Sequence, residues 1–211
     1  MLLVAHRIPA TRAACERLAA AGAHVFEADV QVDDRGRVVV SHYLAFGPAF
    51  QRDNWRIRPR AQAVRDPLLR DVAELVPASC LLLLDMKGKS GARLTSALRD
   101  AIPDTSRFRV CGGTPDDLDT LRGAGFRTWR TIGNGAQLRA VLSGGRLADD
   151  AVSVRHTLLT REIVAELHER APSLVAWTVN SARRARQLVD LGADGITTDR
   201  FAVLHEIARS G

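Results

Sequence analysis

The sequence predicts a (β/α)8 TIM barrel, an α/β fold in which eight parallel strands form a closed ring surrounded by helices. The first observation is that eight short apolar runs alternate with amphipathic stretches along the 211 residues. The second is that in several of these stretches apolar residues recur at i, i+3, i+4 and i+7, the pattern of a helix packed on a sheet. Eight such units favour a closed barrel over an open doubly wound sheet. We therefore expect residues 1–211 to form a single, short barrel domain without a sizeable insertion.

The eight apolar runs are the expected barrel strands, at residues 2–5, 25–30, 81–86, 108–111, 128–131, 151–154, 174–178 and 195–198. Helices are expected between and after them, at residues 11–21, 67–75, 93–101, 116–124, 136–142, 161–170, 182–191 and 201–208. A further β-like run at 38–42 follows the turn DDRG and extends the second unit.

Residues 43–66 fit neither the helical nor the strand period. Gly47, Pro48 and Pro59 within this segment predict a long irregular loop. Because the segment follows the second strand unit, the loop would lie over the C-terminal face of the barrel, where enzymes of this fold have their active sites.

The chain carries an excess of basic residues. Lys and Arg outnumber Asp and Glu by 30 to 24, a formal net charge of +6. This balance suits an anionic partner, whether a phosphate ester, a nucleic acid or an anionic membrane surface, and does not distinguish among them. The basic segment 55–65 lacks the repeated aromatic residues of a strand-binding groove, so we expect no specific nucleic-acid binding.

The length of the apolar runs and the spacing of the cysteines indicate the cellular compartment in which the protein is expected. No run approaches the roughly 20 apolar residues that a transmembrane helix needs, and the N-terminal MLLVAHR has no basic leader with a long apolar region. We therefore expect a cytoplasmic protein without a transmembrane segment. Cys15, Cys80 and Cys111 are widely spaced and form no CxxC pair, so buried free thiols are expected. The sequence does not indicate an oligomeric state.

Acidic residues interrupt two of the apolar strands. In VFEADV, Glu27 and Asp29 are two positions apart, so both side chains point to the same side of the strand, into the barrel mouth. Asp85 in LLLLDMK is a third carboxylate in a run too apolar to hold it without a partner. Such carboxylates repel one another unless a positive charge lies between them. Oxygen ligands suit one divalent cation, Mg²⁺ or Ca²⁺.

Two histidines end the first strand and the extra β-like run. His6 and His42 can titrate near neutral pH and could act as base and acid on a phosphodiester. Arg7, beside His6, and Lys87, two positions after Asp85, could hold phosphate oxygens. Singly, a Glu-x-Asp pair is more often a salt-bridge feature and a strand-end histidine more often structural. Their concentration at strand ends on one face favours an active site.

These residues lie in motifs that resemble the glycerophosphodiester phosphodiesterase family. The motifs are HR at 6–7, FEADVQVDDRGRVVVSH at 26–42, LDMK at 84–87 and VAWTVNSARRARQLVDLGADGITTDR at 175–200. The resemblance implies a (β/α)8 barrel that hydrolyses phosphodiesters with one divalent metal. It implies that Glu27, Asp29 and Asp85 are metal ligands and that His6 and His42 are acid and base. Arg7 and Lys87 would bind the phosphate, and Trp177 would line the mouth.

The sequence departs from the family pattern at several positions. Ile8 stands where the family usually has a glycine after HR, and Tyr43 replaces the acidic residue that commonly follows the second histidine. Asp85 replaces a glutamate and is shorter by one methylene. The family's insertion is reduced to residues 46–65. These changes concern recognition of glycerol more than metal binding.

Other functions remain open on these residues. The Asp-Met-Lys run also resembles sphingomyelinase D-type phospholipases, so a lyase that releases a cyclic phosphate is an alternative to a hydrolase. A catalytically inactive barrel that binds an anion is another. The substrate is expected to be a small or lipid-derived phosphodiester, and Phe46, Phe50 and Trp55 favour an apolar substituent.

Overall fold

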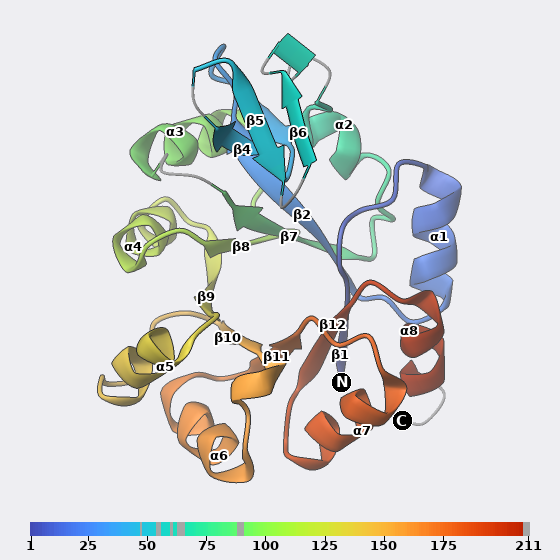
Figure 1. Cartoon of the computed structure of the whole chain (residues 1–211), viewed down its shortest axis with the longest axis vertical. Coiled ribbons are helices and arrows are strands. Elements are labelled where there is room, and N and C mark those ends of the chain that lie inside the picture. The colour runs from blue at the N-terminus through green and yellow to red at the C-terminus, as the bar shows by residue number, and fades with distance from the viewer. Residues whose placement is uncertain (47, 54–55, 60, 63–65, 88–90, 209–211) are drawn as a thin grey trace.

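Eight parallel strands form a closed barrel in the computed structural model, which describes residues 1–46, 48–53, 56–59, 61–62, 66–87 and 91–208. The ring closes because β1 (Leu2–Ala5) pairs with β2 (Val25–Val32) on one side and with β12 (Gly195–Thr198) on the other. Figure 1 shows the strands surrounded by helices. In ring order the strands are β1 (Leu2–Ala5), β12 (Gly195–Thr198), β11 (Leu174–Trp177), β10 (Ala151–Arg155), β9 (Arg127–Ile132), β8 (Phe108–Gly112), β7 (Leu81–Met86) and β2 (Val25–Val32).

Helices follow the strands in the order that the periodicity predicts, so the expected barrel is confirmed. Several begin at a side chain that accepts a hydrogen bond from the first turn, such as Thr11, Thr114, Asn134, Thr160 and Ser181. The helices are α1 (Arg12–Ala20), α2 (Leu69–Ala73), α3 (Gly91–Ala101), α4 (Pro115–Gly123), α5 (Gly135–Leu142), α6 (Arg161–Arg170), α7 (Ala182–Asp190) and α8 (Phe201–Ala208). None of the described helices is long and apolar enough to cross a bilayer.

The apolar residues form two packed layers that follow from strand alternation. Leu82 and Leu84 point outward into the layer between strands and helices, whereas Leu83 points inward. The inner cluster also contains Val25, Trp129 and other residues from neighbouring strands. This cluster fills part of the barrel interior, as barrel cores require. All three cysteines are free and buried, as predicted.

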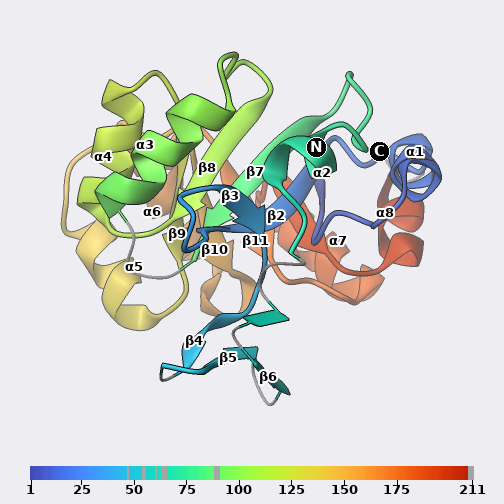
Figure 2. The same ribbon diagram turned by 90° about the horizontal axis from the view of Figure 1, so that it is seen from above.

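The segment after β2 differs from the expected irregular loop. β3 (Val38–Val40) pairs antiparallel with β2, in agreement with the extra β-like run. Beyond it lies a three-stranded antiparallel sheet, which we call the side sheet: β4 (Leu44–Phe46), β5 (Phe50–Asp53) and β6 (Arg56–Pro59). The loop prediction was wrong for these residues because the strands are short and rich in arginine, so apolar alternation is weak. Figure 2 shows the side sheet projecting from the barrel. Gly47 and Trp55 lie outside the described residues.

Candidate active site

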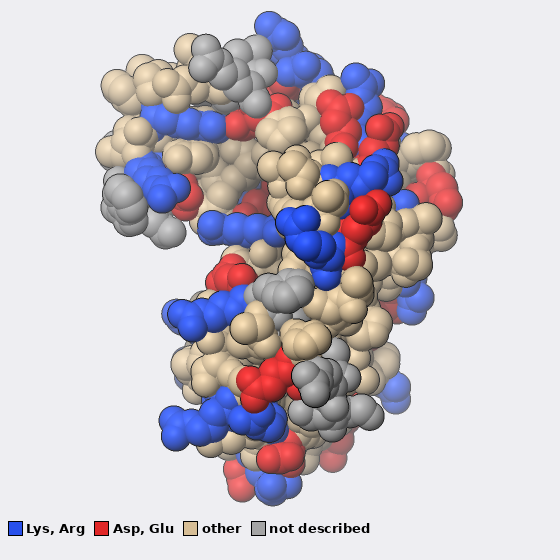
Figure 3. Space-filling model, turned by 90° about the vertical axis from the view of Figure 1, so that its right-hand side faces the viewer, with Lys and Arg blue, Asp and Glu red and all other residues tan. Residues whose placement is uncertain are grey.

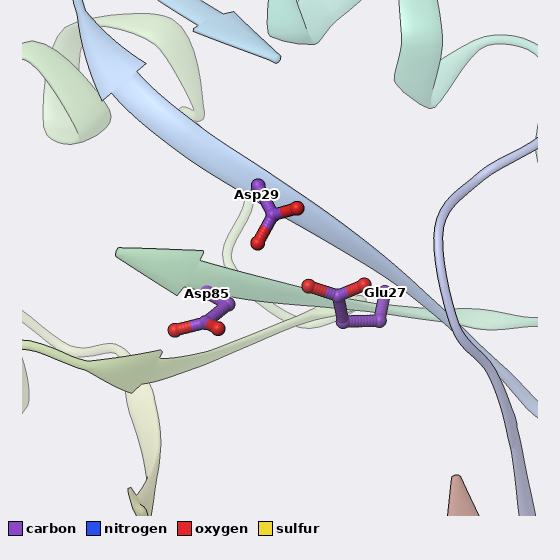
Figure 4. Close-up of side chains that lie close together, drawn as sticks. All are labelled: Glu27, Asp29 and Asp85. Carbon is purple, nitrogen blue, oxygen red and sulfur yellow. The ribbon is translucent and has the colours of Figure 1, made fainter. Parts of the chain in front are cut away.

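Three carboxylates converge at the mouth of the barrel. Glu27 and Asp29 come from β2 and Asp85 from β7, where Asp29 and Asp85 are direct register partners. One oxygen from each of the three lies within 4.8 Å of the others. Figure 4 shows the carboxylates facing the space between the two strands. The sequence predicted this grouping, and the parallel register of β2 and β7 produces it.

Glu27 is buried in a way that leaves half of its carboxylate without a partner. Oε2 accepts a hydrogen bond from the main-chain N–H of Arg7 at 3.0 Å, whereas buried Oε1 has no hydrogen-bond partner among the described residues. Burial, and then the charges of Asp29 and Asp85, raise the pKa of Glu27 well above its ordinary value. An orphaned oxygen beside two further carboxylates fits a divalent cation, which would satisfy the oxygen and offset the repulsion.

Lys87 supplies positive charge to the cluster in this structure. Its ammonium group pairs with Asp29 Oδ1 at 2.9 Å and with Asp85 Oδ2. Although burial opposes the charged form, the carboxylates of Asp85 and Asp29 raise the pKa of Lys87 above its ordinary value. The lysine therefore stays protonated and is held at the two aspartates.

His6 is held between two carboxylates. Its Nδ1 hydrogen-bonds Asp199 Oδ1 at 2.5 Å, and its Nε2 lies 3.7 Å from Glu27 Oε2. Asp199 is fixed in turn, because Asn180 Nδ2 donates to its other oxygen at 2.9 Å. Burial by itself would raise the pKa of Asp199. The hydrogen bonds from Asn180 and His6 outweigh this effect, so the pKa of Asp199 is lowered. An ionised aspartate thus faces Nδ1, and Nε2 faces the cluster.

His42 has the same arrangement on the other side of the cluster. Its Nδ1 hydrogen-bonds Asp53 Oδ1 at 2.5 Å, and its Nε2 lies 3.9 Å from Asp29 Oδ2. Asp53 belongs to β5 of the side sheet. Each histidine therefore has one nitrogen fixed by an aspartate and the other directed toward the acidic cluster, which sets both the ring orientation and the tautomer.

Sequence reasoning missed both aspartates that hold the histidines. Asp199 follows β12, 193 positions from His6, and lies within the motif at 175–200. Its position at a barrel strand end was a usable signal. Asp53 lies in the segment expected to be irregular, so no pattern pointed to it.

One side chain anchors the side sheet that carries Asp53. Arg58 makes a two-pronged ion pair with Asp66, donates to Gln51 Oε1 at 3.0 Å and to Ser41 Oγ at 3.2 Å. Its guanidinium also lies 4.0 Å from the ring centre of Tyr43. These contacts tie β6 to the segment that contains His42, so they help to keep Asp53 beside the imidazole.

The predicted site residues other than Arg7 and Asp29 line a cavity of about 380 Å³. His6, His42, Glu27, Asp85 and Lys87 line it, together with Trp177 opposite the acidic strands. Asp29 lies beneath, bonded to Lys87. The remaining lining residues are small or apolar: Leu83, Cys111, Thr131, Ser153, Thr178 and Thr197. Figure 3 shows the surface hollowed between the upper lobe, which carries the side sheet, and the lower half of the barrel.

Arg7 meets the site through its main chain. Its side chain is exposed and is not among the cavity-lining residues, while its main-chain N–H bonds Glu27. The backbone of Arg7 has a φ of 67°, a left-handed conformation that is uncommon outside glycine. Such conformations cluster at functional sites. In this protein the left-handed residue is the one whose N–H donates a hydrogen bond to the buried Glu27.

Gly112 makes room for Asp85. It has a φ of 76°, and a Cβ at this position would collide with Asp85 Oδ1 and lie 2.7 Å from the main-chain oxygen of Met86. The close approach of β8 to β7 therefore requires a residue without a side chain.

Solved structures of other proteins share this barrel fold. A crystal structure of an Oleispira antarctica phosphodiesterase in complex with sn-glycerol-3-phosphate matches with a TM-score of 0.74 and 14% identity, over 100% of this chain and 97% of that one. The glycerophosphodiester phosphodiesterase of Thermotoga maritima matches with a TM-score of 0.74 and 18% identity, over 100% and 98%. At these identities the similarity shows the fold.

Sequence similarity to known proteins covers part of the chain. Residues 124–203 match the model of the glycerophosphoryl diester phosphodiesterase family. YhdW of Bacillus subtilis (strain 168), named as a candidate glycerophosphodiester phosphodiesterase, is 38% identical over 48 residues, which span 23% of this chain and 20% of that protein. Residues 124–203 thus resemble the glycerophosphoryl diester phosphodiesterase family in sequence, and the solved structures share the fold of the whole chain. The expected resemblance to this family is confirmed.

Proposed function

We propose that the protein hydrolyses a small or lipid-derived, glycerophosphodiester-like phosphodiester with the help of one divalent cation. The observation that carries the proposal is the placement of two imidazoles on either side of a three-carboxylate cluster, each with Nε2 toward the cluster and Nδ1 on an aspartate. This arrangement offers one proton acceptor and one proton donor across a single phosphorus centre.

Glu27, Asp29 and Asp85 would hold the cation through their oxygens. When bound, the ion supplies positive charge that stabilises the negative charge developing on the phosphate oxygens. Mg²⁺ and Ca²⁺ both prefer such oxygen ligands, and the size of the site decides between them. With the carboxylates compensated in this way, the Lys87 ammonium is available to a phosphate oxygen. Arg7, exposed beside His6, contributes a second cationic group.

The two histidines move the protons. One imidazole accepts the proton of the attacking hydroxyl through Nε2, while the oxygen of that hydroxyl forms a new bond to phosphorus. The bond between phosphorus and the leaving alcohol breaks, and the protonated Nε2 of the other imidazole gives a proton to the departing oxygen. Asp53 and Asp199 stabilise the imidazolium forms through Nδ1. Where the substrate has a neighbouring hydroxyl, that group attacks first and water opens the cyclic phosphate afterwards.

The remaining wall of the cavity accommodates the alcohol. Trp177 presents an aromatic surface, and its indole N–H is buried without a hydrogen-bond partner among the described residues. A buried donor of this kind favours an oxygen of the bound substrate as its partner. We therefore assign Trp177 to the binding of the leaving or retained alcohol.

A panel of glycerophosphodiesters and lysophospholipids, assayed with Mg²⁺, with Ca²⁺ and with excess chelator, tests the proposal. We expect turnover that chelator abolishes and that His6→Ala and His42→Ala each reduce strongly, while the circular dichroism spectrum is retained. Undiminished turnover in chelator would contradict the metal requirement.

Phosphorus NMR of the products separates the remaining functions. A phosphomonoester as the final product supports hydrolysis, whereas a persistent cyclic phosphate identifies a lyase. Cation binding without turnover of any diester identifies an inactive, anion-binding barrel.

A further inference from the structure

The two faces of the side sheet differ in chemistry. In the antiparallel register of β5 and β6, Phe50 pairs with Pro59 and Arg52 with Ile57, so these four side chains share one face. All four are exposed, with 47% of Phe50 and 56% of Ile57 accessible to solvent. Among the described residues, few large apolar side chains are as exposed as these two. We call this surface the outer face.

The opposite face of the same sheet is polar and contacts the rest of the protein. Gln51 and Arg58 are register partners on it and bond each other, and Asp53 on it holds His42. An antiparallel sheet that packs on a protein core ordinarily turns its apolar residues inward and its polar residues to water. The side sheet has the reverse pattern. Packing among the described residues therefore does not account for the exposed Phe50 and Ile57.

We propose that the outer face of the side sheet docks on an anionic lipid surface. Phe50 and Ile57 would enter the boundary between headgroups and acyl chains, and Arg52 on the same face would lie at the level of the anionic headgroups. Of the three arginines on β5 and β6, Arg58 pairs with Asp66 and Arg56 lies on the opposite face, so Arg52 is the arginine of these strands on the outer face. Its positive charge, on a chain with a formal net charge of +6, complements a negative membrane surface.

The size of the outer face favours a lipid surface over a protein partner. Stable protein interfaces bury roughly 800 Å² on each partner and involve about 20 to 30 residues a side. The outer-face side chains that the structure describes, four on β5 and β6, provide far less than such an area. Shallow insertion of two apolar side chains beside a cationic group is sufficient for weak, reversible binding to lipid.

The position of the side sheet gives this docking a consequence for the site. Figure 2 shows that the sheet stands off the barrel at one end, and β5 reaches the cavity through the bond between Asp53 and His42. A surface held on the outer face therefore lies close to the cavity mouth. The proposal does not depend on catalysis, because it concerns binding of the whole chain to vesicles.

Co-sedimentation with vesicles of phosphatidylcholine, with and without phosphatidylserine, tests the proposal. We expect the protein to bind the mixed vesicles and to release at high salt, since surface charges are screened. The affinity of the double variant Phe50→Ser, Ile57→Ser for the mixed vesicles is expected to be at least about tenfold lower. The affinity of Arg52→Gln is expected to be about fivefold lower. Turnover of a small, soluble diester by the double variant should equal that of the unchanged protein.

Matched controls lie away from the side sheet. Val189→Ser removes another exposed apolar side chain, on α7, and Arg17→Gln removes an exposed arginine at the end of α1. Both should bind vesicles as the unchanged protein does.

Three results would overturn the proposal. These are equal binding to neutral and mixed vesicles, retained binding by the double variant, and an equal loss in the control variants. A change in the sedimentation coefficient of the double variant without vesicles would show instead that the outer face joins copies of this chain. Loss of soluble-substrate turnover by the double variant would indicate a change in the active site, which is separate from binding to lipid.

Discussion

Asp53 of the side sheet bonds His42 of the barrel mouth, with 2.5 Å between Oδ1 and Nδ1. The two residues are 11 positions apart, yet Asp53 reaches the imidazole only because β5 folds back over the segment that follows β3. Half of the proposed acid–base pair therefore depends on a small sheet that is not part of the barrel. The barrel alone would leave His42 without this partner.

The first prediction concerns the orientation of His42. Asp53→Asn keeps the shape of the side chain but removes the charge that fixes the imidazole, so we expect kcat to fall about 10- to 100-fold. KM should change much less, because Asp53 does not line the cavity. Steady-state kinetics on a small diester measure both constants. Asp71→Asn, at an exposed position of α2, is the control with unchanged kinetics. Equal losses in the two variants would remove Asp53 from the positioning role.

The second prediction concerns Glu27. Burial and neighbouring carboxylates disfavour its ionised form in the folded protein, so Glu27→Gln should raise the melting temperature in chelator at neutral pH. The same variant should bind Mg²⁺ or Ca²⁺ at least about tenfold more weakly, because a ligand charge is lost. Thermal unfolding in chelator, and calorimetric titration with each ion, measure the two effects. A lower melting temperature in chelator would contradict the assigned cost of the buried charge.

The pH dependence of the same comparison has a definite sign. Since the folded-state pKa of Glu27 is raised, the native state binds more protons than the unfolded state between the ordinary and the raised value. The metal-free protein therefore loses stability as pH rises through this range. Glu27→Gln lacks this loss, so its advantage in melting temperature should grow from acidic to neutral pH. A constant difference would show that the pKa is not raised.

The third prediction uses two glycines with similar backbone conformations. Gly112 and Gly125 have φ of 76° and 89°, but a Cβ would meet Asp85 and Met86 at Gly112 and nothing within 4 Å at Gly125. Gly125→Ala should cost only the left-handed strain of about 1 to 2 kcal/mol. Gly112→Ala should destabilise more and also weaken metal binding, because Asp85 must move. Urea unfolding and calorimetric titration separate strain from displacement. Equal effects of the two substitutions would show that Gly112 does not position Asp85.

The fourth prediction concerns the thiols. Cys15, Cys80 and Cys111 are all buried and free. Burial, and then the charges of Asp85 and Glu27, raise the pKa of Cys111 well above its ordinary value. Since the thiolate is the reactive form, dithionitrobenzoate should label the native protein very slowly and all three cysteines after unfolding. Rapid labelling of the native protein at neutral pH would contradict this burial.

Charged side chains of both signs are mixed on the face of the molecule that Figure 3 shows. Basic and acidic side chains alternate over the face shown, and they do not form a continuous basic strip. Among the described residues, several arginines are paired with nearby carboxylates, such as Arg122 with Asp149 and Arg127 with Asp150. On this face the charged groups are therefore scattered and do not gather in one basic patch.

The amino-acid sequence by itself determined the barrel and the acidic cluster. Strand and helix periods are local properties of the chain, and they predicted each barrel unit from its own residues. The spacing of Glu27 and Asp29 fixes their common direction on β2 in the same local way. Asp85 joins them because neighbouring parallel strands end at the same face.

Only the tertiary structure decided which groups hold the histidines. Asp199 reaches His6 because closure of the barrel places β12 beside β1, and Asp53 reaches His42 through a sheet whose weak apolar alternation gave no signal. The pairing of Lys87 with Asp29 is likewise set by the register of β2 and β7. Contacts between distant or irregular segments depend on the whole packing of the chain. No local period in the sequence encodes them.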